Sequence, residues 1–116
     1  MVNVYVTAPL CAGAERELAA HGGEAGDLRL RVVCLPSAES SRKLDLSQIG
    51  ANARRATEDS SSIAYIGERA RAASRFSAPI LNAAEIQQYA GISGSVAMNE
   101  LLGALEEGRL SPRGNL

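Results

Sequence analysis

Residues 60–90, SSSIAYIGERARAASRFSAPILNAAEIQQYA, decide the fold of this chain. The apolar run 63–66 predicts a short strand that Gly67 ends, and the segment 69–84 is rich in good helix formers. Residues 86–90 then predict a second strand. Two strands joined by a helix form a crossover that makes the strands parallel, and parallel strands are covered by helices on both faces. We therefore expect the rest of the chain to supply the further layers of an α/β fold.

The patterns on either side of this stretch predict strands and helices in alternation. The expected strands are residues 2–8, 28–35, 63–66 and 87–89, and the expected helices are residues 14–21, 47–58, 69–84 and 95–107. Their sum is a three-layer open parallel sheet of about four strands in the order 2-1-3-4, with helices on both faces. We expect a single α/β domain at 1–108 and a flexible C-terminal tail at 109–116.

Local features refine this expectation. Residues 24–27 are expected to form a turn, and residues 37–46 a polar loop without regular structure. Asp45 or Ser47 is the expected N-cap of the second helix. Pro79 lies inside the pattern of the third helix and should kink or split it.

Composition and charge argue against several classes of protein. The net charge is −1 and no basic stripe is present, so no nucleic-acid partner is expected. No run of about 18 apolar residues exists, so no segment is expected to span a membrane. The chain starts without a signal-peptide pattern, which predicts an extracytoplasmic location if a leader has been removed and a cytoplasmic one otherwise. His21 is the only histidine and the two cysteines fit no metal-binding spacing, so no metal or cofactor is expected.

The fold places the expected ligand site at the carboxyl ends of the first and third strands, where the strand order reverses. The loops that meet there are residues 9–13 and 67–74. The start of the helix after the third strand can accept a carboxylate, Arg69 or Arg71 can pair with an anion, and Ser74 can donate its hydroxyl. The alternative is that both arginines are solvated and that Ser74 only caps its helix.

Cys11 follows the first strand at the start of a helix, where backbone amides lower the pKa of a thiol. This position suggests a phosphatase or a phosphocysteine carrier as an alternative function. The phosphatase signature has one residue more between its cysteine and arginine than the stretch from Cys11 to Arg16. The competing expectation is a buried cysteine or a disulfide with Cys34, which ends the neighbouring strand. A disulfide requires an oxidising compartment.

Several motifs resemble those of the type 1 periplasmic solute-binding proteins, and the likeness is greatest to the receptors of branched-chain amino-acid ABC transporters. The motifs are QIGANARRA at 48–56, IAYIGE at 63–68, AS at 73–74 and SAPILNAAEI at 77–86, and the resemblance covers most of residues 2–90. It implies two lobes of this α/β build that trap a solute between them, without catalysis. The chain then corresponds to the first part of lobe one, a half-lobe without the second wall.

The resemblance also implies positions at which a solute is held. These positions are Leu10, Cys11, Arg69, Ala70, Arg71 and Ser74. Members of the family carry small polar residues and Gly where this chain has Ala70, Arg71 and Ala72. Arg71 therefore indicates either a preference for an acidic solute or a pocket that has been lost.

Three functions follow from these patterns. The first is non-catalytic binding of a small amino-acid-like or carboxylate solute at the carboxyl ends of the first and third strands. The second is an interaction or regulatory domain that has lost ligand binding, and the third is a phosphoryl carrier or phosphatase that depends on Cys11. The final helix carries a wide apolar stripe and the edge strands are unpaired, so we expect either a homodimer or a missing second lobe.

Overall fold

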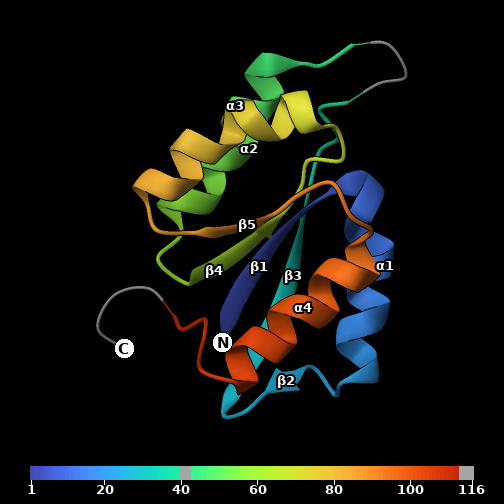
Figure 1. Cartoon of the computed structure of the whole chain (residues 1–116), viewed down its shortest axis with the longest axis vertical. Coiled ribbons are helices and arrows are strands. Elements are labelled where there is room, and N and C mark those ends of the chain that lie inside the picture. Colours follow the sequence, from blue (N-terminus) through green and yellow to red (C-terminus); the bar gives the residue numbers. More distant parts are fainter. Residues whose placement is uncertain (40–42, 113–116) are drawn as a thin grey trace.

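A mixed five-stranded sheet forms the middle layer of the computed structural model, which describes residues 1–39 and 43–112. In chain order the strands are β1 (Val2–Thr7), β2 (Glu24–Ala25), β3 (Leu28–Leu35), β4 (Ser62–Ile66) and β5 (Gln87–Tyr89). The helices are α1 (Ala8–Ala20), α2 (Leu46–Glu58), α3 (Arg71–Ala83) and α4 (Gly94–Glu106). The strands lie in the order β2-β3-β1-β4-β5 (Figure 1). The expected α/β class is therefore confirmed.

The sheet differs from the expected one in its strand count. The four strands predicted from the sequence are parallel and keep the predicted order, but β2 adds a fifth that runs antiparallel to β3. Gly26, at a φ of 59°, lies in the tight turn between these two strands, where glycine is favoured. The expectation of a plain turn at 24–27 was wrong because two residues are too few to show an alternating pattern.

Helices cover both faces of the sheet, and the molecule therefore has three layers. α1 and α4 lie on one face, and α2 and α3 lie on the other (Figure 1). Val4 and Val6 of β1 belong to the apolar core beneath α1 and α4, whereas Tyr5 belongs to the core beneath α2 and α3. β1 is buried along its whole length because it is the central strand and both of its faces are covered.

Two helices differ in extent from the sequence-based expectation. α1 begins at Ala8, directly after β1, and not at residue 14. Pro9 therefore lies in the first turn of this helix, where a backbone N–H is not needed, and does not separate a strand from a loop. Pro79 lies within α3, which continues to Ala83 and is not split. Asp45 is the N-cap of α2, because its carboxylate accepts a hydrogen bond of 3.0 Å from the backbone N–H of Gln48.

The apolar stripe of α4 is covered by the rest of the chain. Met98, Leu101 and Leu102 are buried in the core that α4 shares with α1 and the sheet, and Leu105 packs against that core. Only Val96 of the stripe is largely exposed. The expectation that this stripe forms a dimer surface was therefore wrong, since α1 already covers it.

The C-terminal end of the described chain is packed rather than extended. The backbone N–H groups of Arg109 and Leu110 both donate to the carbonyl of Ala104, and the side chain of Leu110 packs against the core. Residues 113–116 of the expected tail and residues 40–42 of the expected loop lie outside the described residues. Among the helices of the described chain, none has the length and apolarity needed to cross a membrane.

Candidate functional site

A cleft opens where the first turns of α1 and α4 meet, beyond the carboxyl ends of the central strands. It has a volume of about 800 Å³ and is lined by residues of the first turns of α1, by Arg16 and Arg69, and by residues 91–95 at the start of α4. The two helices approach closely because Gly94 has no side chain, and a Cβ there would overlap the carbonyl oxygen of Leu10. The cleft is therefore built into the packing of α1 against α4.

The cleft carries positive charge. Arg16 on α1 and Arg69 after β4 both line it and both are exposed. Neither guanidinium forms an ion pair with any residue that the structure describes. The start of α4, capped by Ser93, adds the partial positive charge of a helix N-terminus. An anion is the ligand that this arrangement favours.

The backbone N–H groups that the sequence assigned to a solute carboxylate are occupied by the chain's own Glu39. Its two carboxylate oxygens accept hydrogen bonds from the N–H of Arg69 at 3.3 Å and the N–H of Ala70 at 2.7 Å. Ala70 is the N-cap of α3 and its side chain provides no cap, so the carboxylate of Glu39 takes that role. The start of α3 thus accepts a carboxylate, as expected, but in this structure the carboxylate is internal.

The other predicted site residues lie in three different places. Leu10 and Arg69 line the cleft. Arg71 is exposed at the first position of α3, and Ser74 donates its hydroxyl to the carbonyl of Arg71 at 2.8 Å, so it hydrogen-bonds within its own helix. Of the predicted ligand-binding residues, the structure therefore brings only Leu10 and Arg69 together in the cleft. Cys11 lies apart from the cleft.

Cys11 and Cys34 are joined in a disulfide that connects α1 to the end of β3. Their Cα atoms are 5.9 Å apart, and the two residues are 23 positions apart in the sequence. The disulfide expected as one alternative is therefore present. In this state Cys11 has no free thiol, which a cysteine-dependent phosphatase or phosphoryl carrier would need.

Arg16 is the charged residue of the cleft that was not assigned to the site from the sequence, and residues 91–95 were not assigned to it either. Pro9, Ala12, Gly13 and Arg16 all line the cleft. They share one helix face because they are spaced by three or four positions. This signal becomes visible only when the helix is known to start at Ala8, since a helix that begins at residue 14 leaves Pro9 and Ala12 in a loop.

A buried polar network lies at the end of β4. Glu68 is 1% exposed and accepts hydrogen bonds from the hydroxyls of Tyr65 at 2.8 Å and Ser77 at 3.0 Å. Gln88 on β5 donates to Ser77 at 2.7 Å and to the carbonyl of Gly67 at 2.8 Å. Burial raises the pKa of the Glu68 carboxyl above its ordinary value, and burial beside Glu68 raises the pKa of the Tyr65 hydroxyl. The network ties β4, α3 and β5 together and was not predicted from the sequence.

No family model, curated protein or solved structure matches this chain. The resemblance to the type 1 solute-binding proteins therefore stays a prediction from the sequence motifs. The interpretation of the site accordingly depends on its geometry. That geometry is a positively charged cleft at the carboxyl ends of parallel strands, next to a helix start that holds a carboxylate.

Proposed function

We propose that this chain is a non-catalytic solute-binding domain that takes a small amino-acid-like or carboxylate solute in the cleft between α1 and α4. The observation that carries the proposal is the presence of Arg16 and Arg69 in one cleft, without a carboxylate partner in the described part of the chain. Arginine side chains that line one cleft can bind a carboxylate through charge-assisted hydrogen bonds. Each such bond contributes about 1.5–3 kcal/mol.

The position of the cleft supports the same proposal. Ligands of open parallel sheets bind beyond the carboxyl ends of the strands, at the point where the strand order reverses. Here β3 and β4 lie on opposite sides of β1, so the order reverses next to β1. The cleft begins in the first turn of α1, which follows β1 directly.

The proposal includes a half-lobe of the type 1 solute-binding build, as the sequence motifs imply. A half-lobe provides one wall of a cleft, and the cleft between α1 and α4 is open to solvent at its arginine side chains. A second copy of the chain or a second lobe would supply the opposite wall. We therefore propose a homodimer as the state that closes the site.

A second candidate function is an interaction domain that has lost ligand binding. The observation that favours it is the hydrogen bonding of Glu39 to the N–H groups of Arg69 and Ala70, because a solute carboxylate could not use the same donors. In this alternative Glu39 replaces the ligand permanently. The two candidates differ in whether any external carboxylate binds.

The test is a thermal-shift and calorimetric screen with glutamate, leucine and succinate, applied to the wild-type chain and to Arg16→Gln, Arg69→Gln and the double variant. Arg75→Gln is the matched control, because Arg75 is exposed on α3 and does not line the cleft. We expect at least one solute to raise the Tm of wild type and of Arg75→Gln. The loss of either cleft arginine should weaken binding about tenfold or more.

The expected rise in Tm follows from ligand linkage. A solute at 100 times its Kd stabilises the folded state by about 2.7 kcal/mol. For a domain of this size that amounts to a rise of roughly 10 °C. Absence of any shift in wild type, or equal shifts in wild type and the double variant, would reject the cleft as a solute site. Absence of any shift would favour the interaction domain.

A further inference from the structure

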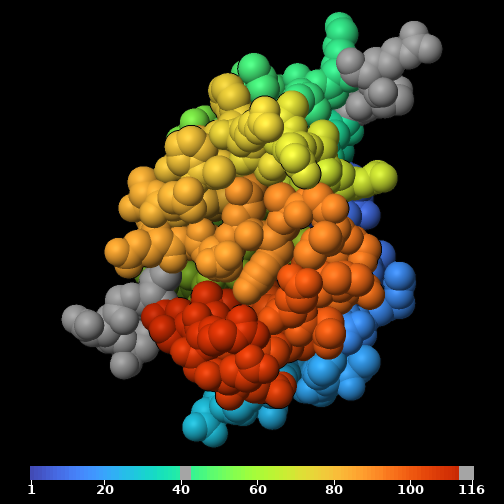
Figure 2. Space-filling view, viewed as in Figure 1, coloured from blue at the N-terminus to red at the C-terminus, as the bar shows by residue number. Residues whose placement is uncertain are grey.

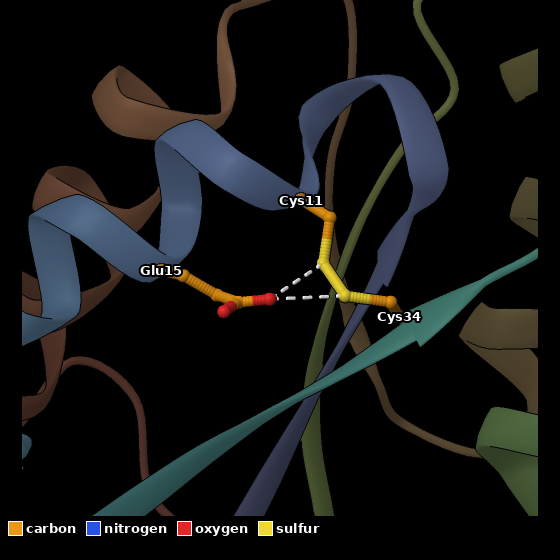
Figure 3. A group of neighbouring side chains, drawn as sticks. All are labelled: Cys11, Glu15 and Cys34. Carbon is orange, nitrogen blue, oxygen red and sulfur yellow. Dashed lines mark hydrogen bonds between the residues drawn. A yellow bond between two sulfur atoms is a disulfide. The ribbon is translucent and has the colours of Figure 1, made fainter.

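Three ligand atoms meet on the side of α1 that faces β3, apart from the anion cleft. They are the Sγ atoms of Cys11 and Cys34 and the carboxylate Oε1 of Glu15, and they all lie within 4.8 Å of one another (Figure 3). Oε1 of Glu15 is 3.2 Å from Sγ of Cys11 and 3.1 Å from Sγ of Cys34. Figure 3 shows the Glu15 side chain directed toward the paired sulfurs from the same helix that carries Cys11.

The position of this oxygen has no hydrogen-bond explanation in the disulfide state. The sulfur atoms of a disulfide carry no hydrogen, so neither of them can donate to the carboxylate of Glu15. A carboxylate oxygen at this distance from two sulfurs is stabilised when the sulfurs are thiols that donate to it, or when a cation lies between the three atoms. Both conditions require that Cys11 and Cys34 be reduced.

We propose that Cys11, Glu15 and Cys34, with both cysteines reduced, form a binding site for a thiophilic divalent cation, for which Zn²⁺ fits best. Zinc sites combine thiolate sulfur at about 2.3 Å with carboxylate oxygen at about 2.0–2.2 Å. At a tetrahedral angle these bond lengths place sulfur and oxygen about 3.5 Å apart. The two observed separations of 3.1 and 3.2 Å are close to this value, so the carboxylate needs little movement, whereas the two sulfurs, which are bonded to each other in the disulfide, must move apart after reduction.

The backbone already provides the spacing that such a site needs. Cys11 and Glu15 are one helical turn apart and therefore lie on one face of α1. Cys34 enters from β3 with its Cα atom 5.9 Å from that of Cys11. Glu15 and Cys34 are exposed, so a cation can reach them from solvent. Three protein ligands leave the fourth tetrahedral position to water.

The sequence predicted no metal site because the spacing of its cysteines matches no known motif. The third ligand is a carboxylate on the helix, and the sulfur that completes the site comes from a strand 23 positions away in the sequence. Only the parallel pairing of β1 with β3 brings that strand end next to the start of α1. The topology, and not the local pattern, therefore forms the site.

Disulfide and metal are alternative states of the same residues. A small-molecule dithiol reduces the bond between Cys11 and Cys34, which yields two protein thiols and the oxidised dithiol. The cation then displaces the two thiol protons, which leave to solvent, and binds both thiolates together with the Glu15 carboxylate. The oxidised chain has lost both thiolate ligands and does not bind the cation.

The test is a titration with Co²⁺ of the whole chain, reduced with dithiothreitol and freed of it by gel filtration without oxygen. We expect one Co²⁺ to bind per chain, with a sulfur-to-cobalt charge-transfer band in the near ultraviolet and the visible bands of a tetrahedral ion. Added Zn²⁺ should remove these bands. The oxidised chain should show none of them. A reduced wild-type chain that gives no charge-transfer band would overturn the proposal.

Two variants test the ligand set. Glu15→Gln keeps both cysteines, and we expect it to weaken Co²⁺ binding tenfold or more and to change the visible bands. Glu17→Gln is the matched control on the same helix, since Glu17 pairs with His21 and not with the sulfurs. Cys34→Ser should lose most of the charge-transfer intensity. Equal affinity and equal bands in Glu15→Gln and wild type would reject the three-ligand site.

Discussion

Glu68 is a buried carboxyl group whose hydrogen-bond partners are hydroxyls. Burial raises its pKa above the ordinary 4.5, with the nearby carboxylate of Glu39 adding to the rise, although both hydrogen bonds oppose it. A carboxyl group whose pKa is raised in the folded state does not reduce the stability of the fold below pH 4.5. As the pH rises through the folded-state pKa, the group ionises and the stability of the fold decreases. The ionised form of Glu68 should therefore destabilise the fold at higher pH.

We predict that Glu68→Gln raises the free energy of unfolding near neutral pH, because the neutral amide avoids the cost of burying a charged carboxylate. A glutamine can still accept from Tyr65 and can donate to the hydroxyl of Ser77. Urea unfolding from pH 4 to pH 8 should show wild type losing stability relative to the variant. Glu100→Gln, in an exposed part of α4, should follow wild type at every pH. A variant that loses stability in parallel with wild type would contradict this account.

Glu39 makes the other residue-scale contact that can be tested, because its carboxylate caps α3. We predict that Glu39→Ala lowers the free energy of unfolding by about 1 kcal/mol, the usual loss for a missing helix cap. The same change frees the N–H groups of Arg69 and Ala70, so carboxylate binding in calorimetry should become tighter. If carboxylate affinity is unchanged while stability falls, Glu39 has a structural role only.

At the scale of elements, the packing of α1 on α4 depends on Gly94. We predict that Gly94→Ala destabilises the chain by about 1–3 kcal/mol, because the added Cβ would collide with the backbone of Leu10 and push the two helices apart. Gly103→Ala is the matched control on the same helix, since a Cβ added there meets no atom within 4 Å beyond its chain neighbours and the nearby backbone of its own helix. It should stabilise the chain by about 0.5–1 kcal/mol. Chemical unfolding of both variants measures the difference, and equal stabilities would refute the close contact.

The strands and most helices were predictable because each carries its own periodicity. The expected strand at 87–89 and the expected second strand at 28–35 agree with β5 and β3. The start of α1 was not predictable in the same way, because Pro9 is compatible both with the end of a strand and with the first turn of a helix. Because of this ambiguity, Arg16 was not predicted to be a residue of the site.

Contacts between segments that are distant in the sequence could not be predicted from local sequence patterns. Glu39 reaches the N–H of Ala70 across 31 positions, and Glu15 meets Cys34 across 19. When a helix start lacks its own capping side chain, as at Ala70, the sequence indicates that backbone N–H groups there need an acceptor. It does not indicate which group will be that acceptor. The start of α3 therefore holds a carboxylate, but it belongs to the chain's own Glu39, and the binding of a solute carboxylate there stays a prediction.

At the scale of the molecule, the sheet has two edges, at β2 and at β5, and the edge at β5 is a surface on which a partner can bind. The large exposed apolar side chains of the described chain lie on different segments, since Met1 is at the N-terminus and Leu46, Phe76 and Val96 lie on α2, α3 and α4. β5 is the last strand of its side of the sheet, and Gln87 on it is exposed. In Figure 2 the orange segment that contains β5 reaches the surface between the yellow of α3 and the red of α4. An unpaired edge strand is the surface on which a second copy can add.

We predict that the homodimer proposed to close the solute site forms through this edge, and that its population rises with protein concentration in light scattering on a sizing column. Gln87→Lys places a charge on the edge and should shift the mass to that of the monomer. Asn82→Lys adds the same charge at an exposed position near the end of α3 and should leave the dimer intact. A monomer mass for wild type at every concentration would reject the homodimer. The cleft between α1 and α4 would then be a single open wall, and solute affinity would depend on Arg16 and Arg69 alone.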